Sequence, residues 1–207
     1  MDPRLTSWGV GVKSRAAKVA GPGSSPRVPP IWLFTDDIRL PDPRSAVASL
    51  PKGICGVVLR HDKAPDRLQL GEELSQICRM RRIVLVVAGD PKLAHHLRAG
   101  IHLRGGRKLR RIGTKKTALI TCSCHDPIEA TRAKRASADA IFISPLFATD
   151  SHPGAKPLGT LRWMALSLKF HRVRIALGGI SAEKLRSIPR ARCTGFGAIG
   201  YFGITPR

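Results

Sequence analysis

The chain has 207 residues and a formal net charge of +22, from 36 Lys and Arg against 14 Asp and Glu. This length suits one domain with a sizeable core, and no apolar run reaches bilayer length, so we expect no membrane partner. The charge attracts polyanions, but binders of single-stranded nucleic acid need aromatic platforms, and only 5% of residues are aromatic. The composition therefore favours a basic, solvated surface over a nucleic-acid partner.

The cysteine pattern argues against disulfides and structural zinc. The five cysteines are odd in number and form no CxxC pair. Cys122 and Cys124 would share one face of a strand, but nothing near them completes a zinc site. We expect reduced, buried thiols in a cytoplasmic protein.

The sequence divides into an N-terminal part and a longer second part. Residues 1–30 carry scattered basic side chains and no periodic apolar face, which predicts a disordered basic leader. From residue 31 to residue 207, eight short apolar segments alternate with stretches that suit helices. Strands are expected at 32–35, 56–59, 83–87, 100–103, 118–122, 140–143, 173–177 and 196–199, and helices at 69–80, 92–99, 127–138, 160–170 and 182–188. This α/β pattern predicts a single (β/α)8 TIM barrel, with a doubly wound sheet as the alternative.

Polar residues or glycines follow each expected strand. Ligands bind at the carboxyl ends of strands in such folds. Gly178 and Gly179 follow the seventh strand and Gly200 follows the eighth, and backbone N–H groups at such glycines can approach a phosphate. The sixth strand opens into a long loop, 144–159, of small polar and turn-forming residues. The pattern indicates a phosphorylated ligand.

Several short motifs, in order and at consistent spacing, resemble the thiamine phosphate synthase/TenI family. They are 33–36 (LFTD), 57–60 (VVLR), 99–103 (AGIHL), 123–125 (SCH), 144–149 (SPLFAT), 177–180 (LGGI) and 195–200 (GFGAIG). Each motif is weak alone, and together they are specific. The resemblance implies a (β/α)8 barrel of thiamine biosynthesis that binds a phosphorylated thiazole.

The resemblance also implies the substrate-binding residues. The thiazole phosphate would rest on backbone amides at Gly178, Gly179, Ile199 and Gly200. Arg60 and Ser123 match positions that hold the pyrophosphate of hydroxymethylpyrimidine pyrophosphate in the synthases, and Thr149 matches the same pocket. A leaving pyrophosphate needs positive charge where its own charge grows.

The magnesium ligands of the synthases are where the chain departs from the family. Their Asn-Asp pair after the third strand falls on Ala88 and Gly89, with Asp90 one residue late, and their second Asp falls on Arg107. Magnesium needs oxygen ligands in near-octahedral geometry, which an arginine does not supply. We expect no cofactor, unless the chain is a synthase in which a displaced acid such as Asp90 binds magnesium.

In the loop after the sixth strand, the chain resembles the TenI branch of the family better than the synthases. This resemblance implies Ser151 and His152 as further substrate contacts. That branch includes thiazole tautomerases, which move a proton without metal. His125 matches their catalytic acid/base histidine, and an imidazole suits that role because it titrates near neutrality. We therefore expect a TenI-like tautomerase.

Three alternatives remain open. The first is a thiamine phosphate synthase, which would bind the pyrimidine pyrophosphate as well. The second is a barrel that binds a thiamine precursor without turnover, and the third is a nucleic-acid binder that uses the basic run 104–116. A homo-oligomer is compatible with each.

Overall fold

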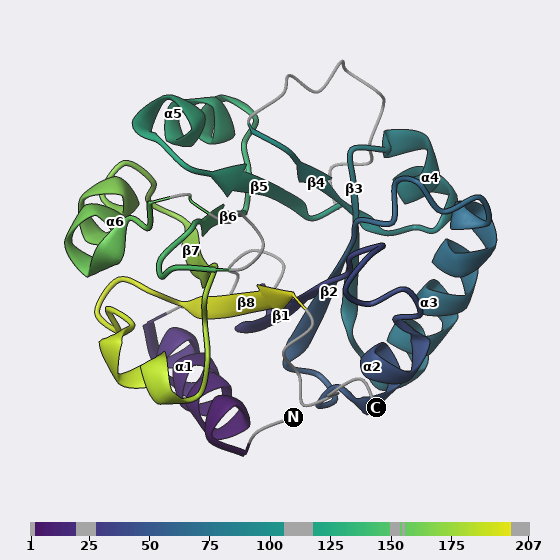
Figure 1. Ribbon diagram of the computed structural model, residues 1–207, viewed down its shortest axis with the longest axis horizontal. Coiled ribbons are helices and arrows are strands. Elements are labelled where there is room, and N and C mark those ends of the chain that lie inside the picture. The colour runs from purple at the N-terminus through teal and green to yellow at the C-terminus, as the bar shows by residue number, and fades with distance from the viewer. Residues whose placement is uncertain (1–2, 20–27, 106–117, 150–153, 155, 200–207) are drawn as a thin grey trace.

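Eight parallel strands close into a barrel in this computed structural model, which describes residues 3–19, 28–105, 118–149, 154 and 156–199 (Figure 1). The strands are β1 (Ile31–Phe34), β2 (Cys55–Leu59), β3 (Val84–Ala88), β4 (Gly100–Leu103), β5 (Ile120–Cys124), β6 (Ala140–Ile143), β7 (Val173–Leu177) and β8 (Gly195–Ile199). Each pairs with the next in chain order, and β1 pairs with β8 from Ile31↔Phe196 to Phe34↔Ile199. The expected (β/α)8 barrel is confirmed.

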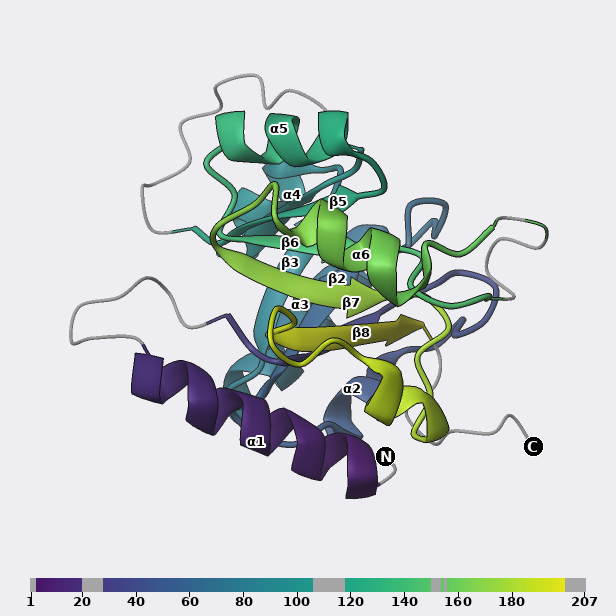
Figure 2. The same cartoon turned by 90° about the vertical axis from the view of Figure 1, so that its left-hand side faces the viewer.

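Helices surround the barrel on its outer side (Figures 1 and 2). They are α1 (Pro3–Val19), α2 (Arg44–Ser49), α3 (Arg67–Arg81), α4 (Pro91–His96), α5 (Pro127–Arg135), α6 (Gly159–Ser167) and the 3-10 helix η1 (Glu183–Ser187). Asp90 and Asp126 cap α4 and α5, accepting from the N–H of Leu93 and Glu129, and each cap precedes a proline. A proline at the first helical position loses no intrahelical hydrogen bond, so both starts are locally encoded.

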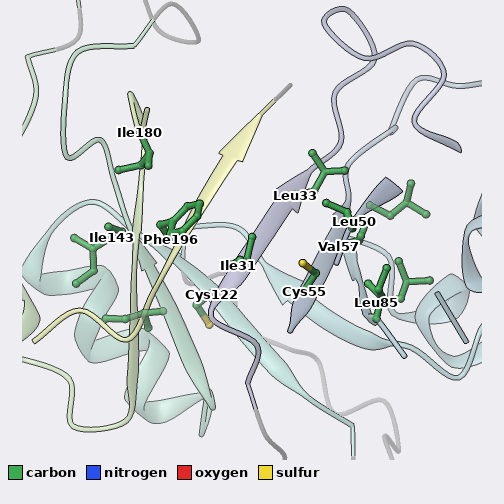
Figure 3. Packing of buried hydrophobic residues seen from close by; sticks show 14 of the residues in the cluster. Ile31, Leu33, Leu50, Cys55, Val57, Leu85, Cys122, Ile143, Ile180 and Phe196 are labelled. Carbon is green, nitrogen blue, oxygen red and sulfur yellow. The ribbon is translucent and has the colours of Figure 1, made fainter. Parts of the chain in front are cut away.

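The apolar side chains form an inner and an outer layer. Inside the barrel, Trp32, Phe34 and Phe142 pack edge to face, with ring centroids 4.8 and 5.2 Å apart. The outer layer fills the space between strands and helices and includes Leu33, Val57 and Phe196 (Figure 3). Strands β1, β2, β4 and β6 are buried at every residue, so both of their faces are covered, which explains why their sequences are largely apolar.

Helix α1 differs from the expected disordered leader. Leu5, Trp8 and Val12 recur at a helical spacing of three and four, and all three side chains are buried. The Trp8 ring lies 5.4 Å from the Phe196 ring of β8, edge to face. Residues 3–19 therefore form a helix whose apolar stripe packs on the barrel beside β8 (Figure 2).

Smaller differences concern element bounds. β5 runs to Cys124, so Ser123 lies inside a strand and not after it, and α2 was not expected at all. The expected helix at 182–188 is a short 3-10 helix. Within the described residues, no helix is long and apolar enough to span a membrane.

Candidate active site

Polar side chains of β4 and β5 gather at the carboxyl end of the barrel, inside its ring of strands. His102 of β4 is buried, and its Nδ1 and Nε2 lie 2.9 Å from Thr121 Oγ1 and 3.0 Å from Ser123 Oγ. Its ring contacts Phe34 and Phe142 edge to face, so this layer rests directly on the aromatic core. His102 therefore forms the polar floor of the site, consistent with its expected place inside a strand.

Burial, followed by the nearby guanidinium groups of Arg60 and Arg104, lowers the pKa of His102 to about 3. The imidazole is therefore neutral at ordinary pH and carries one proton, so it donates to one hydroxyl and accepts from the other. A proton on Nε2 leaves the hydroxyl hydrogen of Ser123 for a ligand. The substrate role expected for Ser123 stays a prediction, and its hydroxyl lies beside His102 at the carboxyl end of β5.

Arg60 follows β2 and is half-buried. Burial and then Arg104 lower its guanidinium pKa, while Asp36 and Asp62 oppose this effect. Its backbone N–H donates to Thr35 Oγ1 over 2.9 Å, which fixes the end of β2 against the end of β1. Two guanidinium groups, Arg60 and Arg104, therefore act on each other at the mouth of the barrel, an arrangement that favours an anionic ligand between them.

An ion-pair chain runs beside these groups across the ends of β2, β3 and β4. Arg67 of α3 lies 3.1 Å from Asp62 and 3.4 Å from Asp90, and it donates to the carbonyl of Ala88 over 2.9 Å. Arg104 pairs with the second carboxylate oxygen of Asp62. Asp62, Arg67, Asp90 and Arg104 thus form one alternating network.

This network does not fit a magnesium site. Both oxygens of Asp62 contact guanidinium groups, and Asp90 contacts Arg67 while it accepts from the N–H of Leu93. Among the described residues, no three His, Cys, Asp or Glu side chains are grouped to bind a metal ion. The carboxylate of Asp90, which would bind magnesium if the chain uses it, therefore already caps α4 and pairs with an arginine.

His125 lies on the rim and not on the floor. Its side chain is half-exposed, and Glu129 Oε2 accepts from its backbone N–H over 2.7 Å and lies 2.8 Å from its Nδ1. A carboxylate only accepts, so Nδ1 carries the proton, and Nε2 of the neutral ring is an available base. The expected catalytic histidine thus has an orienting carboxylate, as a general acid/base requires.

Gly178 and Gly179 lie against the loop after β6. Their φ angles are +90° and +64°, and a Cβ at Gly179 would overlap the carbonyl oxygen of Ala148. Phe147 N–H donates to Gly178 O over 3.1 Å, so the loop is bonded to the end of β7. Close contacts and positive φ angles therefore already require glycine at these two positions, apart from the phosphate role expected for them.

The other expected ligand contacts fall at the same end of the barrel or outside the described residues. Ile199 is the last residue of β8, and Thr149 is the last described residue before positions 150–153 in the loop after β6. Ser151, His152 and Gly200 lie outside the described residues, as does most of the basic run 104–116.

Sequence reasoning missed Arg67 and Glu129. Glu129 had a signal in its i, i+4 spacing from His125, whereas Arg67 meets Asp90 only through the fold.

The family model and the curated relatives agree on one family. A family model described as thiamine monophosphate synthase matches residues 34–201. A "putative thiamine-phosphate synthase 2" of Aquifex aeolicus is 30% identical over 75% of this chain and 84% of its own length. A thiamine-phosphate synthase of Geobacillus kaustophilus is 28% identical over 70% of this chain and 67% of its own length. The solved thiamine phosphate pyrophosphorylase of Pyrococcus furiosus superposes with a TM-score of 0.67 at 22% identity, covering 82% and 84% of the two chains, which bears on the fold.

Proposed function

Because the chain belongs to the thiamine monophosphate synthase family, we propose that it joins hydroxymethylpyrimidine pyrophosphate to thiazole phosphate with release of pyrophosphate. This was the alternative in the sequence analysis. The names of the relatives weigh towards it over the tautomerase. The five cysteines, all free and buried, support a cytoplasmic location as part of the proposal.

The observation that carries the proposal is the pair of guanidinium groups, Arg60 and Arg104, above the neutral His102–Ser123 floor. In the reaction, the thiazole nitrogen forms a bond to the pyrimidine methylene carbon while the carbon–oxygen bond to pyrophosphate breaks. The electron pair leaves with the pyrophosphate, so negative charge grows on it. Fixed cations at that point stabilise the transition state more than the ground state.

Mass spectrometry of product formation tests this directly. The purified chain receives both substrates, and thiamine phosphate should appear with one pyrophosphate for each product. Arg60→Gln should lower kcat/KM by about a hundredfold, the usual effect of removing one donor to a developing charge. Arg135→Gln, an exposed arginine at the end of α5 away from the mouth, is the control and should react normally. Absence of product from the unmodified chain under all metal conditions would rule the synthase out.

A second candidate, thiazole tautomerase, is favoured by the His125–Glu129 pair. An NMR time course on thiazole carboxylate phosphate should show proton exchange that His125→Ala abolishes. His96 provides a matched control because its Nε2 also lies 2.8 Å from a glutamate, Glu72, on an exposed helix surface. Exchange that survives His125→Ala as well as His96→Ala would refute this candidate.

A further inference from the structure

We propose that this chain binds the pyrophosphate group of its substrate with guanidinium groups in the place of a divalent cation. The inference rests on the proposed function and names how that site handles the leaving group. Its basis is the ion-pair network of Asp62, Arg67, Asp90 and Arg104, which lies across the ends of three strands at the mouth of the barrel.

The charges in the network balance as they would around a divalent ion. Arg67 and Arg104 together carry +2, and they lie between the two carboxylates of Asp62 and Asp90, which carry −2. A magnesium ion between the same two acids would have the same sum. Arg60 lies beside the network together with Asp36 and Arg39, whose charges cancel, so one positive charge is left over for an anion that enters the mouth.

The guanidinium groups differ in how exposed they are, and this assigns them different roles. Arg67 is held on three sides by Asp62, Asp90 and the carbonyl of Ala88, and only 18% of its side chain is exposed, so it is fixed. Arg104 is 42% exposed and contacts one carboxylate, so part of its planar fork remains available. A guanidinium fork binds phosphate oxygens in a bidentate manner. Arg104 and Arg60 are therefore the groups that meet the ligand, and Arg67 positions Asp62.

The guanidinium of Arg104 lies close to the backbone after β3. Gly89 there has a φ of +70°, which favours glycine, and a Cβ would lie 3.9 Å from Arg104 Nε, an ordinary contact distance. The guanidinium thus lies across Gly89, which presents no side chain between the network and the mouth. The burial of His102 beneath Arg60 and Arg104 keeps a third positive charge from forming under them.

Isothermal titration of inorganic pyrophosphate into the full chain, in excess EDTA and in excess magnesium, tests the inference. Binding in EDTA is expected. Arg104→Gln should weaken it by about ten- to hundredfold, as loss of a charge-assisted contact does, and Arg135→Gln should not. Asp62→Asn should tighten it, because Arg104 loses its carboxylate partner. A lost magnesium ligand would instead weaken binding in magnesium.

The outcomes separate this inference from the proposed function. Three results would overturn the inference. They are pyrophosphate binding that requires magnesium, an effect of magnesium on the affinity larger than that of Arg104→Gln, and weaker pyrophosphate binding by Asp62→Asn. Thiamine phosphate formed only with magnesium keeps the proposed function and overturns the inference. Metal-free pyrophosphate binding without any thiamine phosphate overturns the proposed function and keeps the inference.

Discussion

The buried imidazole of His102 makes the stability of the barrel sensitive to acid. Its folded pKa of about 3 lies below the ordinary value of 6.5, so the folded state resists protonation that the unfolded state accepts. The associated stability is fully present above about pH 6.5 and is lost as pH falls towards about 3. Between about pH 7 and about pH 4.5, the linkage amounts to about 3 kcal/mol for this one group.

Urea unfolding at several pH values measures this loss, with His102→Gln as the comparison because glutamine does not titrate. The variant should be less stable near neutrality, since Thr121 and Ser123 lose their partner. On acidification it should lose about 3 kcal/mol less than the unmodified chain. Carboxylates contribute equally to both proteins and cancel in the difference. Parallel loss in both proteins would refute a buried, neutral His102.

Three further predictions concern stability and reactivity. Trp8→Ala should destabilise the chain by about 3 kcal/mol in urea unfolding, whereas the half-exposed Val10→Ala should change it by less than about 0.5 kcal/mol; equal effects would mean that α1 does not pack on the barrel. Gly179→Ala should cost at least about 1 kcal/mol more than Gly159→Ala, because both glycines have nearly the same positive φ but only Gly179 faces the Ala148 carbonyl. The five buried thiols, whose pKa values burial raises to about 11 or 12, should react with a thiol reagent only after unfolding; fast reaction of the native chain would contradict their burial.

The barrel itself could be predicted because most of its strands are short, largely apolar runs that local composition marks. The caps of α4 and α5 were equally local, as Asp-Pro pairs. Helix α1 carried a signal in the spacing of Leu5, Trp8 and Val12, but two glycines interrupt the apolar pattern. Gly9 lies close to Ile31, so the glycine that weakens the helical signal also permits the close approach of α1 to β1.

The ion-pair network could not be predicted in the same way. Arg67 and Asp90 are 23 positions apart, and they meet because α3 begins with Arg67 at the end of the barrel where β3 leads into Asp90. The resemblance to the synthases suggested Asp90 as a magnesium ligand, if the chain uses the metal, because it lies one residue after their acidic position. Only the fold shows that its carboxylate caps a helix and pairs with a guanidinium, and these contacts argue against a magnesium site there.

The alternation of side chains along a strand places neighbouring residues at the mouth on opposite faces of the barrel wall. Val58 belongs to the inner layer and Leu59 to the outer layer, so Arg60 continues the inner face and His61 the outer face. His61 is accordingly buried under the loop after β1, with Nε2–H donating to Leu40 O over 3.1 Å and Nδ1 2.8 Å from Thr35 Oγ1.

The same parity runs through β4 and β5. His102 and Arg104 alternate with the outer-layer Leu103, and Ser123 alternates with the outer-layer Cys122 and Cys124. A period of two, anchored on the inner aromatic residues, thus brings Arg60, His102, Arg104 and Ser123 together from three strands. The adjacent residues Arg60 and His61 therefore differ in place, because the strand turns them to opposite sides of the barrel wall: Arg60 faces the mouth, where a ligand contact is proposed, and His61 is bonded into the loop after β1.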